Sequence, residues 1–534
     1  MHADYSELAK MVGDRLLHVQ APGRLRNPFA IEDDPGAFHT TGWLGAYDTS
    51  HSPVAVAAET AADIATAVNF ARDRGLGLVV KGTGHDYLGR SCAPGSLLIW
   101  THPMRDITVH DAFVPAAGRS GPGRPGTGVP AISVGAGTRW LEAYQALAAR
   151  GRCVQGGGCT SVGAAGGFTQ GGGFGSFSRR YGTAAGNMLE AEVVTASGEI
   201  LVTNASQHPD LFWALRGGGG GTFGVVSRLT MRTHPMPGTL AIVRGAIRAA
   251  TDGDFRRLIG ALVRFLPDLC DDRWGEQVRL SGDNTAAFLM TAVDVTEADA
   301  HGIWRPFLAW AGADSAFTSD VSVLAIPFAS LWDASAWDET LADMICRDDR
   351  PGQPPGRFWW VGDDAQVSQY LHAYQSRWLP GWLFLHRAGP LADALFAASR
   401  HWGISLHVNK GLWGAAAEAL ARDRATAVNP AVFDAAALVI SASMQPYAFP
   451  GVPGHEPDLG LAADRARRVS GAMDVIRALA PDSGSYLNET DYFEPDWQRS
   501  FWGGHYPRLL QIKRTYDPHH LFRVHHGVGS ENGT

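Results

Sequence analysis

The chain has few cysteines and no long apolar run. Its 534 residues contain five cysteines, too few and too scattered for the disulfide framework of a small secreted domain. No stretch of about 18 uncharged apolar residues is present, so no membrane-spanning helix is expected. The N-terminal sequence MHADYSELAKMVGDRLLHVQ lacks the apolar segment of a secretory signal. These absences predict a soluble, cytoplasmic protein without a membrane partner.

Clustered positive charge is also missing. The formal net charge is −8 at pH 7 and no basic block is present. Because contacts to phosphate backbones need clustered Lys and Arg, no nucleic-acid partner is expected. A hydrophobic fraction of 45% is typical of a folded globular protein, and the length suggests more than one domain. We expect a small-molecule substrate and a monomer or homodimer.

Several common catalytic motifs are absent. The chain has no G-K-[ST] of a Walker loop and no G-x-S-x-G elbow of a hydrolase. It also lacks a G-x-G-x-x-G fingerprint that is followed by a helix and an acidic residue. Histidine pairs occur at 519–520 and 525–526, but no H-E-x-x-H or paired C-x-x-C accompanies them. We therefore predict no metal site.

Glycine, by contrast, is abundant, and three glycine-rich segments lie in the first half of the chain. They are KGTGHDYLGRSC (81–92), GGGCTSVGAAGGFTQGGGFG (156–175) and RGGGGGTFGVV (216–226). Glycine allows backbone N–H groups to approach a large anionic ligand closely. A flexible linker is the alternative for the second segment, but linkers are polar and serine-rich, whereas this one carries Val162 and Phe174. Together the three segments predict one cofactor site.

Two side chains in these segments are suited to react with such a ligand. His85 lies in a tight glycine turn directly after a predicted strand, and Cys159 lies within the second segment. A surface turn that happens to carry a histidine is the alternative for His85. A disulfide with Cys153 is the alternative for Cys159, and the expected cytoplasmic location disfavours it.

The pattern of strands and helices predicts an α+β protein in two parts. Before Pro235, short strands alternate with amphipathic helices, for example a helix over 62–75 and a hairpin over 188–203 that turns at Ser197-Gly198. Beyond it the glycine-rich motifs vanish and helices dominate. Helical period occurs over 255–269 and 463–480, and strands are expected over 286–295 and 436–445. The predicted domains are 1–237, 238–480 and a C-terminal segment 481–534.

Four ordered motifs resemble the FAD-linked oxidases of the vanillyl-alcohol oxidase and p-cresol methylhydroxylase (PCMH) superfamily, in particular the berberine bridge enzyme-like branch. The motifs are the histidine segment 81–92, the cysteine segment 156–175, LFWALRGGGGGTFGVV (211–226) and the tail FWGGHYPRLLQIKRTYDPHHLF (501–522). The tail is most similar to members associated with secondary metabolism. The resemblance implies a PCMH-type FAD-binding domain of two α+β subdomains, and a substrate domain with an antiparallel sheet covered by helices.

The resemblance also implies a flavin held by two covalent bonds. His85 would bond the 8α carbon of the isoalloxazine ring and Cys159 the C6 carbon. Val162 matches the position that controls oxygen access, where valine resembles the oxidase pattern. The remaining residues expected to bind FAD are Lys81, Gly82, Thr83, Gly84, Asp86, Gly89, Arg90, Ser91, Gly158, Gly163, Gly166, Gly167, Gly171, Gly172, Gly173, Gly175, Gly224, Val225 and Val226.

One departure from the family pattern affects the catalytic base. Many relatives carry Y-x-N-Y near the C-terminus, whereas this chain has Tyr486-Leu487-Asn488-Glu489. We expect Glu489 to act as the base and Tyr486 and Asn488 to position flavin or substrate; a structural pairing of Glu489 is the alternative. Asp491 is a further candidate by position alone.

The resemblance implies an oxidase that removes hydride from an alcohol, lactol or activated C–H bond and passes the electrons to O2. The alternatives are a dehydrogenase or oxidative cyclase with another acceptor, and a ligand-binding protein without turnover. The substrate is not named by any motif. Side chains that could face it are His407, Asn409, Trp413 and Gln445.

Overall fold

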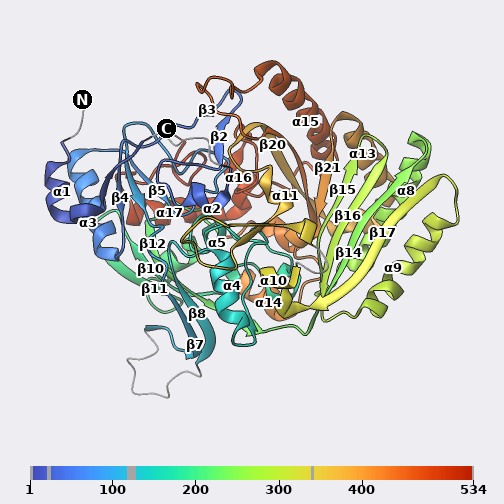
Figure 1. Cartoon of the computed structure of the whole chain (residues 1–534), viewed down its shortest axis with the longest axis horizontal. Helices are drawn as coiled ribbons and strands as arrows, with labels where there is room; N and C mark the ends of the chain where they lie inside the picture. Colours follow the sequence, from blue (N-terminus) through green and yellow to red (C-terminus); the bar gives the residue numbers. More distant parts are fainter. Residues whose placement is uncertain (1–3, 21–25, 117–127, 338–341, 532–534) are drawn as a thin grey trace.

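The computed structural model describes residues 4–20, 26–116, 128–337 and 342–531 (Figure 1). Its N-terminal part holds a small four-stranded sheet in the order β1-β4-β6-β5. Helix α3 (Ala61–Arg74) covers this sheet; Thr60 and Asp63 form its capping box, and Gly75 ends it in the left-handed conformation at φ 61°. The strands are β1 (Leu16–His18), β4 (Val54–Ala57), β5 (Leu78–Lys81) and β6 (Leu97–Trp100).

A second sheet of five strands follows, in the order β11-β10-β12-β8-β7. Its predicted hairpin is confirmed: Val194 pairs with Ile200 across a turn in which Gly198 has φ 83°. Helices α4 (Trp140–Ala148) and α7 (Pro209–Leu215) pack into its core. The strands are β7 (Ile107–Phe113), β8 (Val129–Gly135), β10 (Met188–Val194), β11 (Ile200–Asn204) and β12 (Val225–Arg232).

A third sheet of nine strands dominates the other side of the molecule, in the order β17-β14-β16-β15-β21-β22-β20-β2-β3 (Figure 1). Long helices cover its outer face and bury the largest apolar cluster, namely α8 (Asp252–Phe265), α9 (Glu297–Gly312), α13 (Ala388–His401) and α15 (Leu459–Leu479). Seven of its strands come from the middle of the chain: β14 (Thr239–Ala249), β15 (Trp274–Ser281), β16 (Thr285–Val293), β17 (Phe317–Pro327), β20 (Gln369–Pro380), β21 (Ile404–His407) and β22 (Ala435–Gln445).

Two short strands of this sheet come from the N-terminal part of the chain. They are β2 (Thr40–Trp43) and β3 (Tyr47–Asp48), and β2 pairs in parallel with β20 while every other pair in the sheet is antiparallel. The C-terminal helices α16 (Trp497–Trp502) and α17 (Tyr506–Tyr516) join the core of the five-stranded sheet. The predicted α+β class is confirmed.

None of the described helices is both long and apolar enough to cross a membrane.

Candidate active site

A cavity of about 830 Å³ lies between the glycine-rich segments and the inner face of the nine-stranded sheet. It brings together the three predicted catalytic residues, Tyr486, Asn488 and Glu489. Most of the residues predicted to bind the cofactor also line it: Gly82, Thr83, Gly84, His85, Asp86, Arg90, Ser91, Gly158, Cys159, Val162, Gly163, Gly166, Gly167, Gly224, Val225 and Val226. Segments that are far apart in the sequence therefore share one site.

The other predicted cofactor residues are not among those that line the cavity: Lys81, Gly89, Gly171, Gly172, Gly173 and Gly175. Lys81 is fully buried and its ammonium donates to two backbone carbonyls, those of Asp34 at 2.6 Å and Ala37 at 2.5 Å. Gly173 has φ 76°, and a Cβ there would lie 2.6 Å from the ring of Phe168. Lys81 and Gly173 thus have structural contacts of their own, and cofactor binding by these six residues stays a prediction.

Contacts with three other side chains hold the His85 ring at the cavity wall. It follows β5, and Gly84 before it has φ 84°. Its Nε2 lies 3.0 Å from Oε1 of Glu32 and 2.9 Å from Oγ of Ser161. The ring stacks on His39 with the centroids 3.6 Å apart. The imidazole is therefore fixed by a carboxylate, a hydroxyl and a second ring.

Glu32 was missed by the sequence analysis. It ends the short helix α2 (Pro28–Glu32), which Asn27 caps, and its side chain is 0% exposed. Arg139, also 0% exposed, forms an ion pair with its second carboxylate oxygen. Burial would raise the pKa of Glu32, but Arg139 and the two histidines outweigh burial and hold the pKa well below its usual range.

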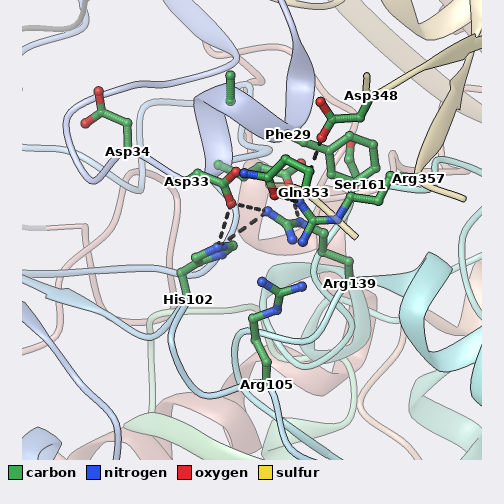
Figure 2. Close-up of polar contacts among 12 residues, drawn as sticks. Phe29, Asp33, Asp34, His102, Arg105, Arg139, Ser161, Asp348, Gln353 and Arg357 are labelled. Carbon is green, nitrogen blue, oxygen red and sulfur yellow. Dashed lines mark hydrogen bonds and ion pairs between the residues drawn. The ribbon is translucent and has the colours of Figure 1, made fainter. Parts of the chain in front are cut away.

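Arg139 also organises the neighbouring charges. Figure 2 shows it reaching Asp33, whose carboxylate also contacts His102; the distances are 2.8 Å and 3.1 Å. Arg139 precedes α4 and Asp33 follows α2, so this network joins the two helices. No sequence motif predicts it, because the partners are about a hundred positions apart.

Replacing Arg139 by leucine should destabilise the protein by about 3–5 kcal/mol, because Glu32 would be left as a buried charge without a cation. Urea denaturation monitored by tryptophan fluorescence measures the change. The control is Arg228→Leu, which removes a solvent-exposed pair with Glu192 and should cost about 0–1 kcal/mol. Equal effects of the two substitutions would contradict the importance assigned to the buried network.

Glu32, His39 and His85 form the one group of the described residues that has metal-ligand spacing, with ligand atoms within 4.8 Å of one another. The contacts of Glu32 with Arg139 and His85 explain the group without an ion. Glu32 is already paired with Arg139, and burial together with His85 lowers the pKa of His39 to about 3, so that ring is neutral. The absence of a metal site stays a prediction.

Cys159 lies in a loop that is tied down on both sides of it. The indole of Trp360 donates to the carbonyl of Gly158 at 2.8 Å, and Oγ1 of Thr160 donates to the carbonyl of Phe358 at 2.6 Å. Its sulfur lies 3.7 Å from Oγ of Ser161, the hydroxyl that also contacts His85. Ser161 thus bridges the two candidate attachment residues. All five cysteines are free thiols, so the alternative disulfide with Cys153 is not formed.

Asp363 is a second residue that the sequence analysis missed. It belongs to α11 (Val361–Asp364), directly after the segment bonded to the Cys159 loop, and it lines the cavity. Burial raises the pKa of Asp363 to about 6, and burial with the nearby Asp363 charge raises the pKa of Cys159 well above its usual value. The thiol is therefore protonated at neutral pH and has a carboxyl group beside it.

Two of the predicted catalytic residues, Tyr486 and Asn488, contact each other, and the third, Glu489, pairs with a lysine. Nδ2 of Asn488 donates to the Tyr486 hydroxyl at 3.0 Å and to the carbonyl of Gly167 at 2.8 Å. Glu489 forms an ion pair with Lys410, a residue that follows β21 and was not predicted. Glu489 thus lines the cavity, as a catalytic base would, and it also forms the structural pair that was the alternative.

The sheet supplies the opposite wall. Arg244, Leu289, Gln277 and His407 follow one another across four neighbouring strands, and all four line the cavity. Four side chains were expected to face the substrate without a motif to support them. Of these, His407 and Asn409 are among the lining residues, whereas Trp413 and Gln445 are not. Burial lowers the pKa of His407 well below its usual value, so its ring is neutral.

The cavity fits a large flat cofactor on two counts. Glycines 158, 166 and 167 lie on its wall, and a Cβ added to any of them would meet no atom within 4 Å. His85 and Cys159, two nucleophilic side chains, line the same cavity, and both contact the hydroxyl of Ser161. The open glycines leave room for a large ligand beside the two side chains.

Comparison with known proteins agrees with the fold and the site. A family model described as an FAD binding domain matches residues 52–204, and one described as berberine and berberine like matches residues 485–529. The FAD-linked oxidoreductase ZEB1 of Gibberella zeae is 34% identical over 485 residues, which is 89% of this chain and 76% of that protein. The flavin-dependent oxygenase ucdF of Aspergillus ustus is 30% identical and covers 93% of this chain and 88% of its own length.

Among solved structures, the VAO-type flavoprotein MtVAO713 of Myceliophthora thermophila C1 has a TM-score of 0.80 at 21% identity, covering 99% of this chain and 95% of its own. Glucooligosaccharide oxidase of Acremonium strictum, described with a 6-S-cysteinyl, 8α-N1-histidyl FAD, has a TM-score of 0.69 at 19% identity and covers 96% and 97%. These likenesses establish the VAO-type fold. The chain belongs to the berberine-like branch of the PCMH-type FAD-linked oxidoreductases, and it is an enzyme of that family.

Proposed function

We propose that the protein is an oxidase that carries FAD on both His85 and Cys159 and oxidises an alcohol, lactol or activated C–H bond of a small molecule. The observation that carries the proposal is the meeting of these two nucleophiles in one glycine-lined cavity. The two attachments named for glucooligosaccharide oxidase support it. When bound, FAD would supply the hydride acceptor and pass two electrons to O2, giving H2O2.

The glycine-rich segments would hold the cofactor. Open glycines such as Gly166 and Gly167 let backbone N–H groups approach the phosphates, where partial positive charge stabilises an anion. His85 and Cys159 would fix the ring and leave the sheet side free for a substrate. Apolar residues of the opposite wall, including Leu240, Ile242 and Leu289, would limit the access of water to this side of the ring.

Glu489 is the proposed acceptor of the substrate proton. It lines the cavity and its carboxylate is oriented by Lys410. Tyr486 is unsuited to be the base, because burial, followed by the charge of Glu489, raises its pKa above the usual value and keeps the phenol protonated. The phenol accepts from Asn488 and keeps its own proton to donate. We therefore assign Tyr486 and Asn488 to orientation of substrate or cofactor.

The use of O2 is tested by the reoxidation of the reduced protein. After anaerobic photoreduction, mixing with air-saturated buffer should reoxidise the flavin rapidly and yield one H2O2 per flavin. Val162 lines the cavity, and Val162→Leu should slow this step about tenfold, which corresponds to about 1.4 kcal/mol in the barrier, because the added methylene crowds the approach of O2. Sluggish reoxidation of the unmodified protein would favour a dehydrogenase or oxidative cyclase instead.

A further inference from the structure

The two oxygens of the buried Glu32 carboxylate serve different partners. Oε1 lies 3.0 Å from Nε2 of His85 and 3.5 Å from Nε2 of His39, whereas Oε2 contacts the Nε–H of Arg139. Glu32 lies before the residues that match the FAD-binding family model, which begin at 52. It touches the predicted attachment residue directly, yet it does not line the cavity itself. Its role is therefore exerted through His85.

The charge of Glu32 decides which nitrogen of His85 carries a proton. Its pKa is held below the usual range, because Arg139 and the two histidines outweigh burial, so the carboxylate only accepts hydrogen bonds. Nε2 of His85 must then be the N–H that donates to it. In a neutral imidazole the other nitrogen, Nδ1, keeps its lone pair. No described residue forms a hydrogen bond with Nδ1, and His85 lines the cavity.

We propose that Glu32 is a positioning residue for flavin attachment: it presents Nδ1 of His85 to the flavin and then serves as the counter-ion of the alkylated ring. This inference rests on the proposed attachment of FAD to His85. A carboxylate that fixes a histidine tautomer and stabilises the imidazolium is a recurring device in catalytic triads. Here it would serve the modification of the protein by its own cofactor.

The atoms and electrons of the attachment balance with O2 as the oxidant. A bond forms between Nδ1 of His85 and the 8α carbon, and one C–H bond of that carbon breaks. The two electrons of the broken bond reach O2, which with that proton and one proton from solvent becomes H2O2. Nε2 keeps its proton throughout, so the imidazole gains one positive charge. Glu32 lies 3.0 Å away to neutralise this charge.

The test measures attachment at His85 alone, in a Cys159→Ala background. Protein made in flavin-starved cells is supplied with FAD in air, and covalent flavin is followed over time by intact mass after acid denaturation. Glu32→Gln keeps the size of the side chain but removes its charge, and it should slow attachment about 10–100-fold, the effect that loss of the orienting partner has on metal-ligating histidines. Glu32→Asp keeps the charge that Arg139 needs but shortens the reach, and it should also attach slowly.

Asp33→Asn is the matched control. Asp33 is the next residue and also pairs with Arg139 (Figure 2), but the hydrogen bonds of the His85 side chain go to Glu32 and Ser161 and not to Asp33. This variant should attach flavin at the rate of the parent. Far-UV circular dichroism shows whether each variant is folded. If Glu32→Gln does not fold, the attachment rate of Glu32→Asp is compared with those of the parent and Asp33→Asn instead.

The attached nitrogen is a readout that a merely structural role of Glu32 would not change. NMR of the isolated flavin peptide should show only Nδ1 in the parent and loss of this selectivity in Glu32→Gln. Parental rates and pure Nδ1 linkage in folded Glu32 variants would overturn the role of Glu32 while leaving the proposed function intact. A Cys159→Ala parent without covalent flavin would overturn both the attachment at His85 and the inference built on it.

Discussion

Replacing His85 and Cys159 together by alanine should release all of the flavin when the protein is precipitated with acid. Either single variant should keep its flavin in the pellet, because one covalent bond remains. The expectation follows from the position of both side chains on one cavity, bridged by Ser161 at 2.9 and 3.7 Å. Absorbance of the supernatant and of the redissolved pellet measures the two fractions.

The control for this experiment is Cys153→Ala. Cys153 is a buried free thiol six positions before Cys159, and it does not line the main cavity. Its replacement should leave all flavin in the pellet. Retention of flavin in the double variant, or release from Cys159→Ala alone, would show that the two attachments are assigned to the wrong residues.

Glu489→Gln should lower the rate of flavin reduction by substrate about 10²–10⁴-fold, the usual contribution of a general base. Glutamine keeps the shape of the side chain and its contact with Lys410 but cannot accept a proton. Anaerobic stopped-flow spectroscopy follows the reduction directly and separates it from the reaction with O2. A turnover substrate comes from a screen of alcohols, sugars and polyketide-like compounds for peroxide release.

Asp491→Asn provides the matched control for Glu489. Its carboxylate is two residues away and accepts from Nε2 of Gln375 at 2.7 Å, but it does not line the cavity. Burial raises its pKa to about 6, so it would be a plausible base by acidity alone. The rate of flavin reduction should be nearly unchanged in this variant. A large loss in Asp491→Asn with little loss in Glu489→Gln would move the base to Asp491.

The sequence predicted the parts of the site that depend on local pattern. His85 and Cys159 stand in glycine-rich segments, where the unusual composition itself indicates a ligand. Their predicted neighbours Gly82, Gly84 and Gly158 line the same cavity. Gly171, Gly172, Gly173 and Gly175 are not among the residues that line the cavity, so their contact with the cofactor stays a prediction.

The residues that the sequence did not predict act through contacts between distant segments. Glu32 meets His85 and Arg139 only after three separate elements have packed together. Lys410 reaches Glu489 across 79 positions of the chain. Each is an ordinary charged residue in a segment without a motif, so nothing local marks it. The parallel pairing of β2 with β20 was not predicted for the same reason. It depends on the register between strands that are more than three hundred residues apart in the sequence.

The most direct test of the account is proteolysis of the unmodified, denatured protein followed by mass spectrometry. If one flavin is bonded to both His85 and Cys159, the peptides that contain them should appear as a single species joined through one FAD. Both free peptides should be missing. Recovery of the two peptides at their unmodified masses, with FAD in the supernatant, would contradict the doubly attached flavin on which the proposed function is built.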